Sequence, residues 1–222
     1  MNKYFEIKSK DEEAEILLYG DIGASWFEEG NGSKEFVEEL KSVKNAKQLS
    51  IRINSGGGSV FEGLAIYNAI DRHSAKKTVY IDGLAASIAS VIAMAGESII
   101  MAENGMFMIH DPFGGVLGNA SEMRKMADAL DKIKEGMILS YQRKSKSSRD
   151  ELSQMMNEET WMTAKEAKAN GFVTEIGKGM KMAASVKIDS SHYKKVPESL
   201  VSQSEGKEDD TNVIPSVPFI PT

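Results

Sequence analysis

The sequence contains no cysteine, and this absence already narrows the chemistry that the chain can perform. Without thiols it can form no disulfide framework, no thiolate nucleophile and no cysteine-based zinc site. Histidine is also scarce, because only His73, His110 and His192 occur among the 222 residues. Any reaction that needs an imidazole therefore has very few candidate bases.

The sequence also lacks an excess of positive charge and a long apolar run. Its 27 basic and 33 acidic side chains give a net charge of −6, which argues against a dedicated nucleic-acid-binding protein. The most apolar stretch, Gly83–Gly96, falls short of the roughly 18 residues that a membrane span needs. The first residues show no apolar segment typical of a secretory signal. We therefore expect a cytoplasmic protein whose partners include neither nucleic acid nor membrane.

Proline is rare and unevenly placed. Four of the five prolines lie in residues 197–222, among serines and acidic residues without a helical or strand period. This composition predicts a disordered or extended C-terminal tail over residues 189–222. Residues 1–188 then form one folded domain, and a hydrophobic content of 41% is ample for its core.

Within this domain, short apolar runs alternate with helical patterns, which predicts an α/β fold with a mostly parallel sheet. The predicted strands are Ala14–Tyr19, Leu49–Ile53, Thr78–Ile81, Ser98–Met101, Met106–Ile109 and Phe172–Ile176. The predicted helices are Lys34–Val43, Val60–Ile70, Ala86–Ala95 and Ala120–Arg143, and capping boxes at Ser148 and Thr163 begin two shorter ones.

The predicted helix Ala120–Arg143 carries one continuous apolar stripe with charged residues on its other faces. Such a helix either lies on the sheet or protrudes to meet a partner helix. The stripe consists of Met123, Met126, Leu130, Ile133, Met137 and Tyr141.

Three segments could carry chemistry. Asn54–Ser59 (NSGGGS) joins a strand to a helix, and its glycines can present backbone N–H groups to a ligand. Ser87 follows a strand expected to end at Asp82 and stands where a helix begins, so it could cap that helix or act as a nucleophile. His110 ends a short strand and precedes a turn. A serine nucleophile needs a base such as His110, and the base needs a carboxylate to orient it, for which Asp111 and Glu159 are candidates.

Four motifs in order resemble the signature segments of the ClpP family, the proteolytic subunit of the Clp protease. They are Asn-Ser-Gly-Gly-Gly-Ser-Val, Gly-Leu-Ala-Ala-Ser-Ile-Ala-Ser, Met-Ile-His-Asp-Pro-Phe-Gly-Gly and Glu-Thr-Trp-Met-Thr-Ala-Lys-Glu-Ala, within residues 14–177. Within this family, the sequence resembles the ClpP-like head maturation proteases of tailed bacteriophages and prophages more than the housekeeping bacterial enzyme. The resemblance implies a ClpP/crotonase-like fold of repeated β-β-α units, in which Ala120–Arg143 is a protruding handle helix.

The resemblance also implies a serine endopeptidase without a cofactor or a metal. It assigns the nucleophile to Ser87, the general base to His110 and the third triad member to Glu159, with Glu158 and Asp111 as alternatives for the third role. The oxyanion hole falls to the N–H groups of Gly57 and Ile88. The walls that bind an extended substrate fall to Gly58, Ser59, Val60 and Pro112.

Polypeptides are the implied substrates, capsid or scaffold proteins among them, and further copies of the chain in stacked heptameric rings are the implied partners. An AAA+ unfoldase is a partner of the housekeeping enzymes, but only about 13 residues precede the first predicted strand here, which argues against dependence on one. Gly56 stands where the family usually has proline, which should loosen that turn. Two other readings stay open, a crotonase-like acyl-CoA enzyme and an inactive capsid-assembly scaffold of the same fold.

Overall fold

The computed structural model describes residues 4–23, 32–178 and 193–197. These residues form one sheet with strand order β1-β2-β3-β4-β5-β8, and β6 pairs with both β4 and β7. The strands are β1 (Phe5–Lys10), β2 (Glu13–Tyr19), β3 (Gln48–Ser55), β4 (Lys76–Ala86), β5 (Ser98–Ala102), β6 (Met106–Ile109), β7 (Thr160–Thr163) and β8 (Glu175–Gly177).

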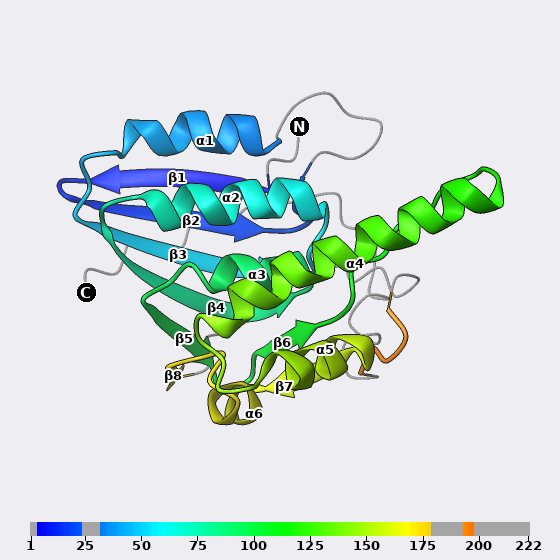
Figure 1. Ribbon diagram of the computed structural model, residues 1–222. Helices are drawn as coiled ribbons and strands as arrows, with labels where there is room; N and C mark the ends of the chain where they lie inside the picture. The colour runs from blue at the N-terminus through cyan, green and yellow to red at the C-terminus, as the bar shows by residue number, and fades with distance from the viewer. Residues whose placement is uncertain (1–3, 24–31, 179–192, 198–222) are drawn as a thin grey trace, which may run out of the picture.

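Helices α1, α2 and α3 lie side by side along the sheet, and α4 extends away from the body of the molecule (Figure 1). Only the β1–β2 and β6–β7 pairs are antiparallel, and the other five strand pairs of the described sheet are parallel. The predicted α/β fold with a mostly parallel sheet is therefore confirmed. The helices are α1 (Ser33–Ser42), α2 (Val60–Arg72), α3 (Ile88–Ala93), α4 (Ala120–Gln142), α5 (Arg149–Asn157) and α6 (Ala164–Ala169).

The core lies between the central strands and the helices that cover them. Ile51 and Ile53 of β3 and Val79 and Ile81 of β4 are almost completely buried, and so is every residue of α3. In both strands these residues alternate with polar or aromatic ones such as Arg52 and Tyr80, and this period of two is typical of a strand. The core therefore holds rigidly the junction between β4 and α3, where Ser87 lies.

The expected end of a strand at Asp82, followed by a helix Ala86–Ala95, is wrong. β4 continues to Ala86, and α3 is the shorter helix Ile88–Ala93. Beyond Ile81 the strand leaves β5 and pairs instead with β6, while the register against β3 shifts between Ile53 and Ser55. The side chain of Asn54 fills the shift, because its Oδ1 accepts the N–H of Leu84 at 3.1 Å. Such a change of neighbours leaves no trace in local periodicity.

Three other strands differ from the prediction. β1 was not predicted, although Phe5 and Ile7 alternate with charged residues, and neither was β7. The expected strand Phe172–Ile176 is wrong in its bounds, since β8 is Glu175–Gly177. Phe172 instead ends the turn after α6, where its N–H donates to the Ala167 carbonyl oxygen and its ring stacks on Phe107.

The long helix was predicted to within one residue, since α4 ends at Gln142 and Arg143 is its C-cap. The residues of its apolar stripe differ in exposure. Met137 and Tyr141 are buried in the core, whereas Met123 near the other end is 53% exposed. Both predicted capping boxes are present, with Ser148 and Thr163 as the N-caps of α5 and α6. In the protruding half of α4 the stripe is therefore only partly covered: Met123 is exposed, whereas Met126 and Leu130 are half-buried and lie close to Gly114.

The predicted tail over residues 189–222 lies outside the described residues except for Tyr193–Pro197. The boundary predicted at residue 188 also lies outside them.

Candidate active site

Ser87 occupies the N-cap position of α3, but its side chain makes no capping hydrogen bond. Its backbone has a φ of 55°, in the left-handed region that non-glycine residues rarely adopt. Its N–H is fixed by the Met108 carbonyl oxygen at 3.1 Å, and its own carbonyl oxygen accepts the Ser90 hydroxyl at 2.5 Å. The sequence left two roles open for this serine, and the structure shows no side-chain capping of α3.

His110 follows the last residue of β6 and meets Ser87 directly. Its Nε2 lies 2.7 Å from the Ser87 Oγ, and both side chains are buried to 6% exposure. The contact follows from the topology, because the parallel pairing of Ala86 with Met108 sets the ends of β4 and β6 side by side. This is the distance at which a neutral imidazole can take a proton from a hydroxyl.

Burial lowers the pKa of His110, and the nearby charges of Glu159 and Asp111 oppose that shift. The direction keeps the imidazole neutral at neutral pH. A neutral ring has one nitrogen free to accept a proton, which is the state that a general base requires.

Glu159 comes next to His110 through the antiparallel pairing of β6 with β7. Ile109 pairs with Thr160, so the residues just beyond them, His110 and Glu159, are adjacent across the pair. Glu159 is buried and also has a positive φ, of 53°. Burial acts to raise the pKa of Glu159, but N–H donors from Lys194, Lys195 and Trp161 outweigh it and lower that pKa. The group is therefore a carboxylate at neutral pH.

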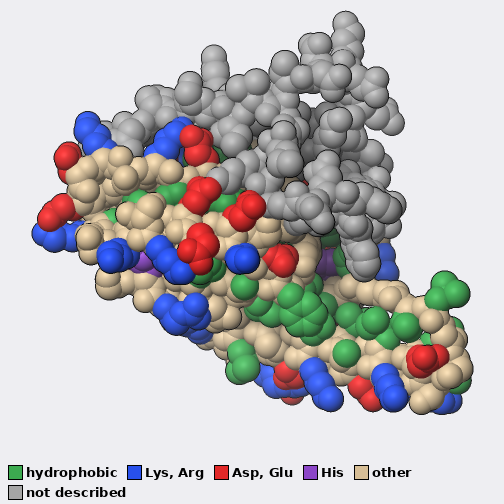
Figure 2. Space-filling model, turned by 90° about the horizontal axis from the view of Figure 1, so that it is seen from above, with side chains coloured by type: hydrophobic (Ala, Val, Ile, Leu, Met, Phe, Trp, Pro, Cys, Tyr) green, Lys and Arg blue, Asp and Glu red, His purple; other side chains and the backbone are tan. Residues whose placement is uncertain are grey.

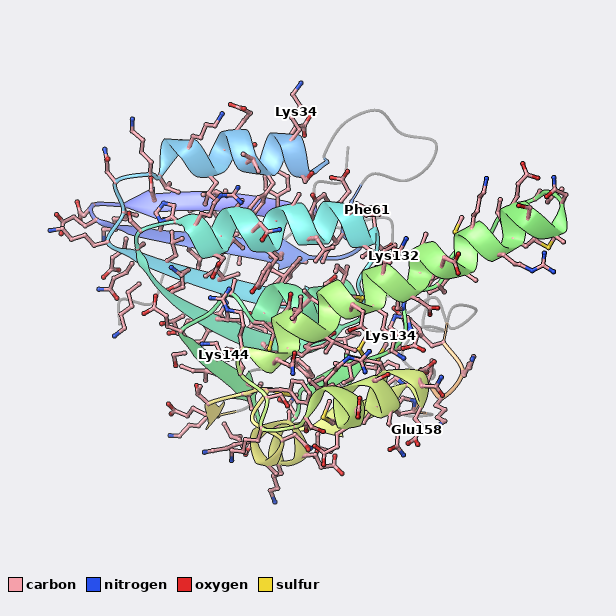
Figure 3. The ribbon with its side chains drawn as sticks, viewed as in Figure 1. Lys34, Phe61, Lys132, Lys134, Lys144 and Glu158 are labelled. Atoms are coloured by element: carbon pink, nitrogen blue, oxygen red, sulfur yellow. The ribbon has the colours of Figure 1, made fainter. Side chains whose placement is uncertain are left out.

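The two alternative carboxylates have other partners. Glu158 is exposed at the end of α5 and accepts a hydrogen bond from Gln154 at 2.9 Å (Figure 3). Asp111 forms an ion pair at 2.8 Å with Lys134 of α4, and Lys134 is labelled in Figure 3. The N–H of Asp111 donates to the Met156 carbonyl oxygen. Of the three carboxylates considered, Glu159 has the burial and the strand position expected of a group that orients His110.

The glycine segment packs against the candidate nucleophile. A Cβ built on Gly57 would stand 2.6 Å from the Ser87 Cβ, and its φ of 108° also favours glycine. A Cβ built on Gly58 would stand 2.2 Å from the Ile22 carbonyl oxygen, which also accepts the N–H of Ser59 at 2.8 Å. The glycines of this loop are thus required by close backbone approach on both sides.

The expected oxyanion donors have different surroundings. The N–H of Gly57 donates to Ser55 Oγ at 3.1 Å, so in this conformation it already has an acceptor. Ile88 is the first residue of α3, where a backbone N–H has no acceptor within its own helix. Its side chain is fully buried against Gly63 of α2.

The expected substrate-binding residues belong to two segments, the start of α2 and the turn after His110. Ser59 is the N-cap residue of α2, although its side chain makes no capping bond, and Val60 begins that helix. Pro112 is buried just after His110, and the following Phe113 is 57% exposed with its ring 5.9 Å from the imidazole. An open apolar surface therefore lies beside the base.

Sequence reasoning missed the contribution of Trp161 and of Tyr193–Lys195. Trp161 Nε1 donates to Glu159 Oε1 at 3.1 Å, and the Tyr193 ring lies 5.5 Å from the His110 ring. The register of β7 could have suggested Trp161. Nothing in the composition of the predicted tail indicated that part of it would reach the site.

Within residues 4–23, 32–178 and 193–197, no group of three or more His, Asp or Glu side chains is placed to hold a metal ion. No helix in the same residues is long and apolar enough to cross a membrane.

Comparison with known proteins identifies the family to which this sequence is similar. The Clp protease family model matches residues 11–180. The ATP-dependent Clp protease proteolytic subunit of Bacteroides fragilis is 37% identical over 139 residues, covering 62% of this chain and 67% of that protein. The subunits of Bacteroides thetaiotaomicron and Leuconostoc citreum are 35% and 32% identical. They match over 63% and 70% of their own lengths, with 62% of this chain covered in each case.

A solved structure, a mutant of ClpP1 from Listeria monocytogenes, superposes with a TM-score of 0.62. The match covers 72% of this chain and 89% of the ClpP1 chain, with 24% sequence identity. At that identity the likeness bears on the fold alone, and it agrees with the ClpP-like fold expected from the motifs.

Proposed function

The chain belongs to the Clp protease family and is a serine-type peptidase, and on that premise we propose that Ser87, His110 and Glu159 form its catalytic triad. The observation that carries the proposal is the 2.7 Å contact between Ser87 Oγ and His110 Nε2, with Ser87 free of any capping role. The burial that lowers the pKa of His110 supports its role as a neutral base.

In the proposed reaction, Ser87 Oγ attacks the carbonyl carbon of a peptide bond as His110 Nε2 takes its proton. The N–H of Ile88 stabilises the negative oxygen of the tetrahedral intermediate, and the N–H of Gly57 joins it by exchanging its hydrogen bond to Ser55 Oγ for one to that oxygen. The C–N bond then breaks, and His110 gives the proton to the leaving amine. Water hydrolyses the remaining serine ester by the same base. Glu159 accepts a hydrogen bond from the Nδ1–H of His110 and so stabilises the imidazolium.

Substitution of the two central residues tests this assignment. Ser87→Ala and His110→Ala should each lower peptide hydrolysis by at least about 10³-fold, because members of a triad act as a unit. Both should abolish labelling by a fluorophosphonate probe. The matched controls are Ser121→Ala, on the exposed first turn of α4, and His73→Ala, whose ring contacts the Val43 carbonyl oxygen away from the site. Full cleavage by Ser87→Ala would show that the nucleophile is another residue.

The same experiment addresses the two other readings of the fold. A crotonase-like acyl-CoA enzyme or an inactive assembly scaffold would leave Ser87 unlabelled by the probe. Neither an acyl-CoA enzyme of this fold nor a scaffold needs the short Ser87–His110 contact, so the contact favours the peptidase.

We propose that the substrates are polypeptides, capsid or scaffold proteins included, and that copies of the chain assemble into stacked rings. The relatives support this, since they are named as proteolytic subunits of an ATP-dependent protease. Degradation of an unfolded model protein should be measured with and without an AAA+ unfoldase and ATP. Equal rates would favour a maturation protease, and a rate that requires ATP would favour a Clp subunit that depends on an unfoldase.

A further inference from the structure

The segment Tyr193–Pro197 lies directly on the candidate active site. The Tyr193 ring meets the His110 ring edge-on at 5.5 Å and the Trp161 ring at 5.9 Å. Its hydroxyl donates to the Gly56 carbonyl oxygen. The same ring packs on a small buried cluster formed by Leu84, Ala86 and Met108. One aromatic side chain thus touches the base, the glycine loop and the strands that carry the site.

The two residues after Tyr193 engage the third triad candidate through their main chain. The N–H of Lys194 donates to Glu159 Oε2 and the N–H of Lys195 to Oε1, both at 2.7 Å. With Trp161 Nε1 also on Oε1, the carboxylate accepts three N–H donors. No hydrogen bond joins Glu159 to His110 among the residues that the structure describes. The segment therefore holds the group that should orient the base.

These contacts have the form of a bound peptide rather than of a loop packed for stability. An aromatic side chain enters a site with ring walls and a carbonyl acceptor, and the following backbone donates to a fixed carboxylate. Lys194 and Lys195 are exposed, so recognition in this stretch relies on main-chain N–H groups that any non-proline residue supplies.

We propose that Gly56, Trp161, His110 and Glu159 form a subsite for a tyrosine side chain followed by two peptide N–H groups, and that Tyr193–Lys195 occupies it as a tethered competitive ligand. The inference rests on the proposed function, because occupancy matters only if Glu159 serves His110. When the segment leaves, the Glu159 carboxylate becomes able to accept a hydrogen bond from the Nδ1–H of His110, and the Gly56 carbonyl oxygen becomes able to bind substrate.

Substitutions in the full-length chain test the proposal through the rate at which a fluorophosphonate probe labels Ser87. Tyr193→Phe removes one hydroxyl hydrogen bond and should raise the rate about fivefold, the factor that corresponds to ~1 kcal/mol. Tyr193→Ala also removes the ring contacts and should raise it about tenfold or more. Adding the peptide acetyl-Tyr-Lys-Lys-Val amide to Tyr193→Ala should slow labelling again, whereas the analogue with alanine for tyrosine should not.

Proline provides a matched pair for the main-chain contacts. Lys194→Pro with Lys195→Pro deletes both N–H donors and should raise labelling at least about tenfold, since hydrogen bonds to a charged acceptor are strong. Lys194→Ala with Lys195→Ala keeps both donors and should label at the wild-type rate. Unchanged labelling in the proline variant would overturn the proposal. Slower labelling would overturn it too, because the segment would then be holding Glu159 in its working position.

Hydrogen exchange keeps the test independent of catalysis. In the Ser87→Ala protein, the amides of Lys194 and Lys195 should be protected, and Tyr193→Ala in that background should remove the protection. Rapid exchange of both amides with the tyrosine present would refute occupancy. A different result is possible, in which both amides are protected but the probe labels Ser87 neither in the wild type nor in any Tyr193 or proline variant. That result would show that the segment is bound and would refute the catalytic role of Ser87 instead.

Discussion

At the scale of single residues, backbone strain marks the candidate catalytic positions. Three non-glycine residues among those described have a positive φ, namely Asp11, Ser87 and Glu159. Asp11 lies in the turn between β1 and β2, a place where aspartate is common. The other two are triad candidates, and such conformations cost about 1–3 kcal/mol each, which the buried surroundings must offset. Sequence periodicity carries no sign of this strain.

The pH dependence of activity should report the state of His110. A base works only when it is unprotonated, so activity is lost as pH falls through its pKa. Burial lowers that pKa below its ordinary value of 6.5, and we expect the acid limb of kcat/KM to have its midpoint below pH 6.5. Glu159 acts to raise the pKa of His110, so Glu159→Gln should move the limb to still lower pH. It should also reduce kcat/KM about 10²-fold or more through loss of orientation.

Glu158→Gln is the control for that profile, since this neighbour is exposed and bound to Gln154. It should leave both the midpoint and the rate unchanged. An acid limb that moves to higher pH in Glu159→Gln, or one that moves only in Glu158→Gln, would contradict the role given to Glu159.

At the scale of elements, the sequence predicted what depends on local pattern and missed what depends on strand neighbours. The helix Ala120–Arg143 and both capping boxes were predictable because a periodic stripe or a spaced residue pair defines them. The extension of β4 to Ala86 was not, because it depends on pairing with β6. The motifs gave Ser87, His110 and Glu159, but only the register of β6 with β7 explains why the last two are neighbours.

Packing between α2 and α3 gives a prediction at this scale. A Cβ on Gly63 would stand 2.2 Å from the Ile88 Cγ1, so the two helices meet without room for a methyl group. Gly63→Ala should destabilise the fold by about 1–3 kcal/mol through overpacking, which lowers Tm by several degrees. It should also lower activity, because Ile88 follows Ser87 in the chain. Thermal unfolding and peptide hydrolysis measure the two effects.

Gly136→Ala in α4 is the matched control, because outside the neighbouring backbone of its own helix no described atom lies within 4 Å of the added Cβ. This change should stabilise the helix by about 0.5–1 kcal/mol. If both alanine variants melt at the same temperature, the close contact at Gly63 has no energetic weight and the prediction is wrong.

At the scale of the whole molecule, apolar side chains gather along the protruding helix α4 and the segment before it (Figure 2). Large hydrophobic residues there are strongly exposed, Leu117 to 103% and Met123 to 53%. Phe61 on α2 and Leu139 on α4 are also exposed, to 69% and 65%. Exposed apolar surface of this kind is typical of protein–protein contacts. It fits one of the two alternatives that the sequence left open, namely that this helix protrudes to meet a partner helix and does not lie on the sheet.

The mass of the assembly tests whether this exposed surface joins the proposed stacked rings. If the protruding half of α4 joins two rings, Leu117→Glu with Met123→Glu places two charges in an apolar contact, where an unpaired charge is costly to bury. The double variant should separate the rings and halve the assembly mass in native mass spectrometry, while circular dichroism stays unchanged. Arg124→Glu, which changes charge on the neighbouring exposed position, should keep the full mass.

A double variant with the wild-type mass would mean that the rings join elsewhere. A wild-type chain that is already monomeric would mean that the exposed face of α4 is not a contact between copies. Because Met123 lies far along α4 from the buried Met137 and Tyr141, the change acts on assembly without touching the core or Ser87.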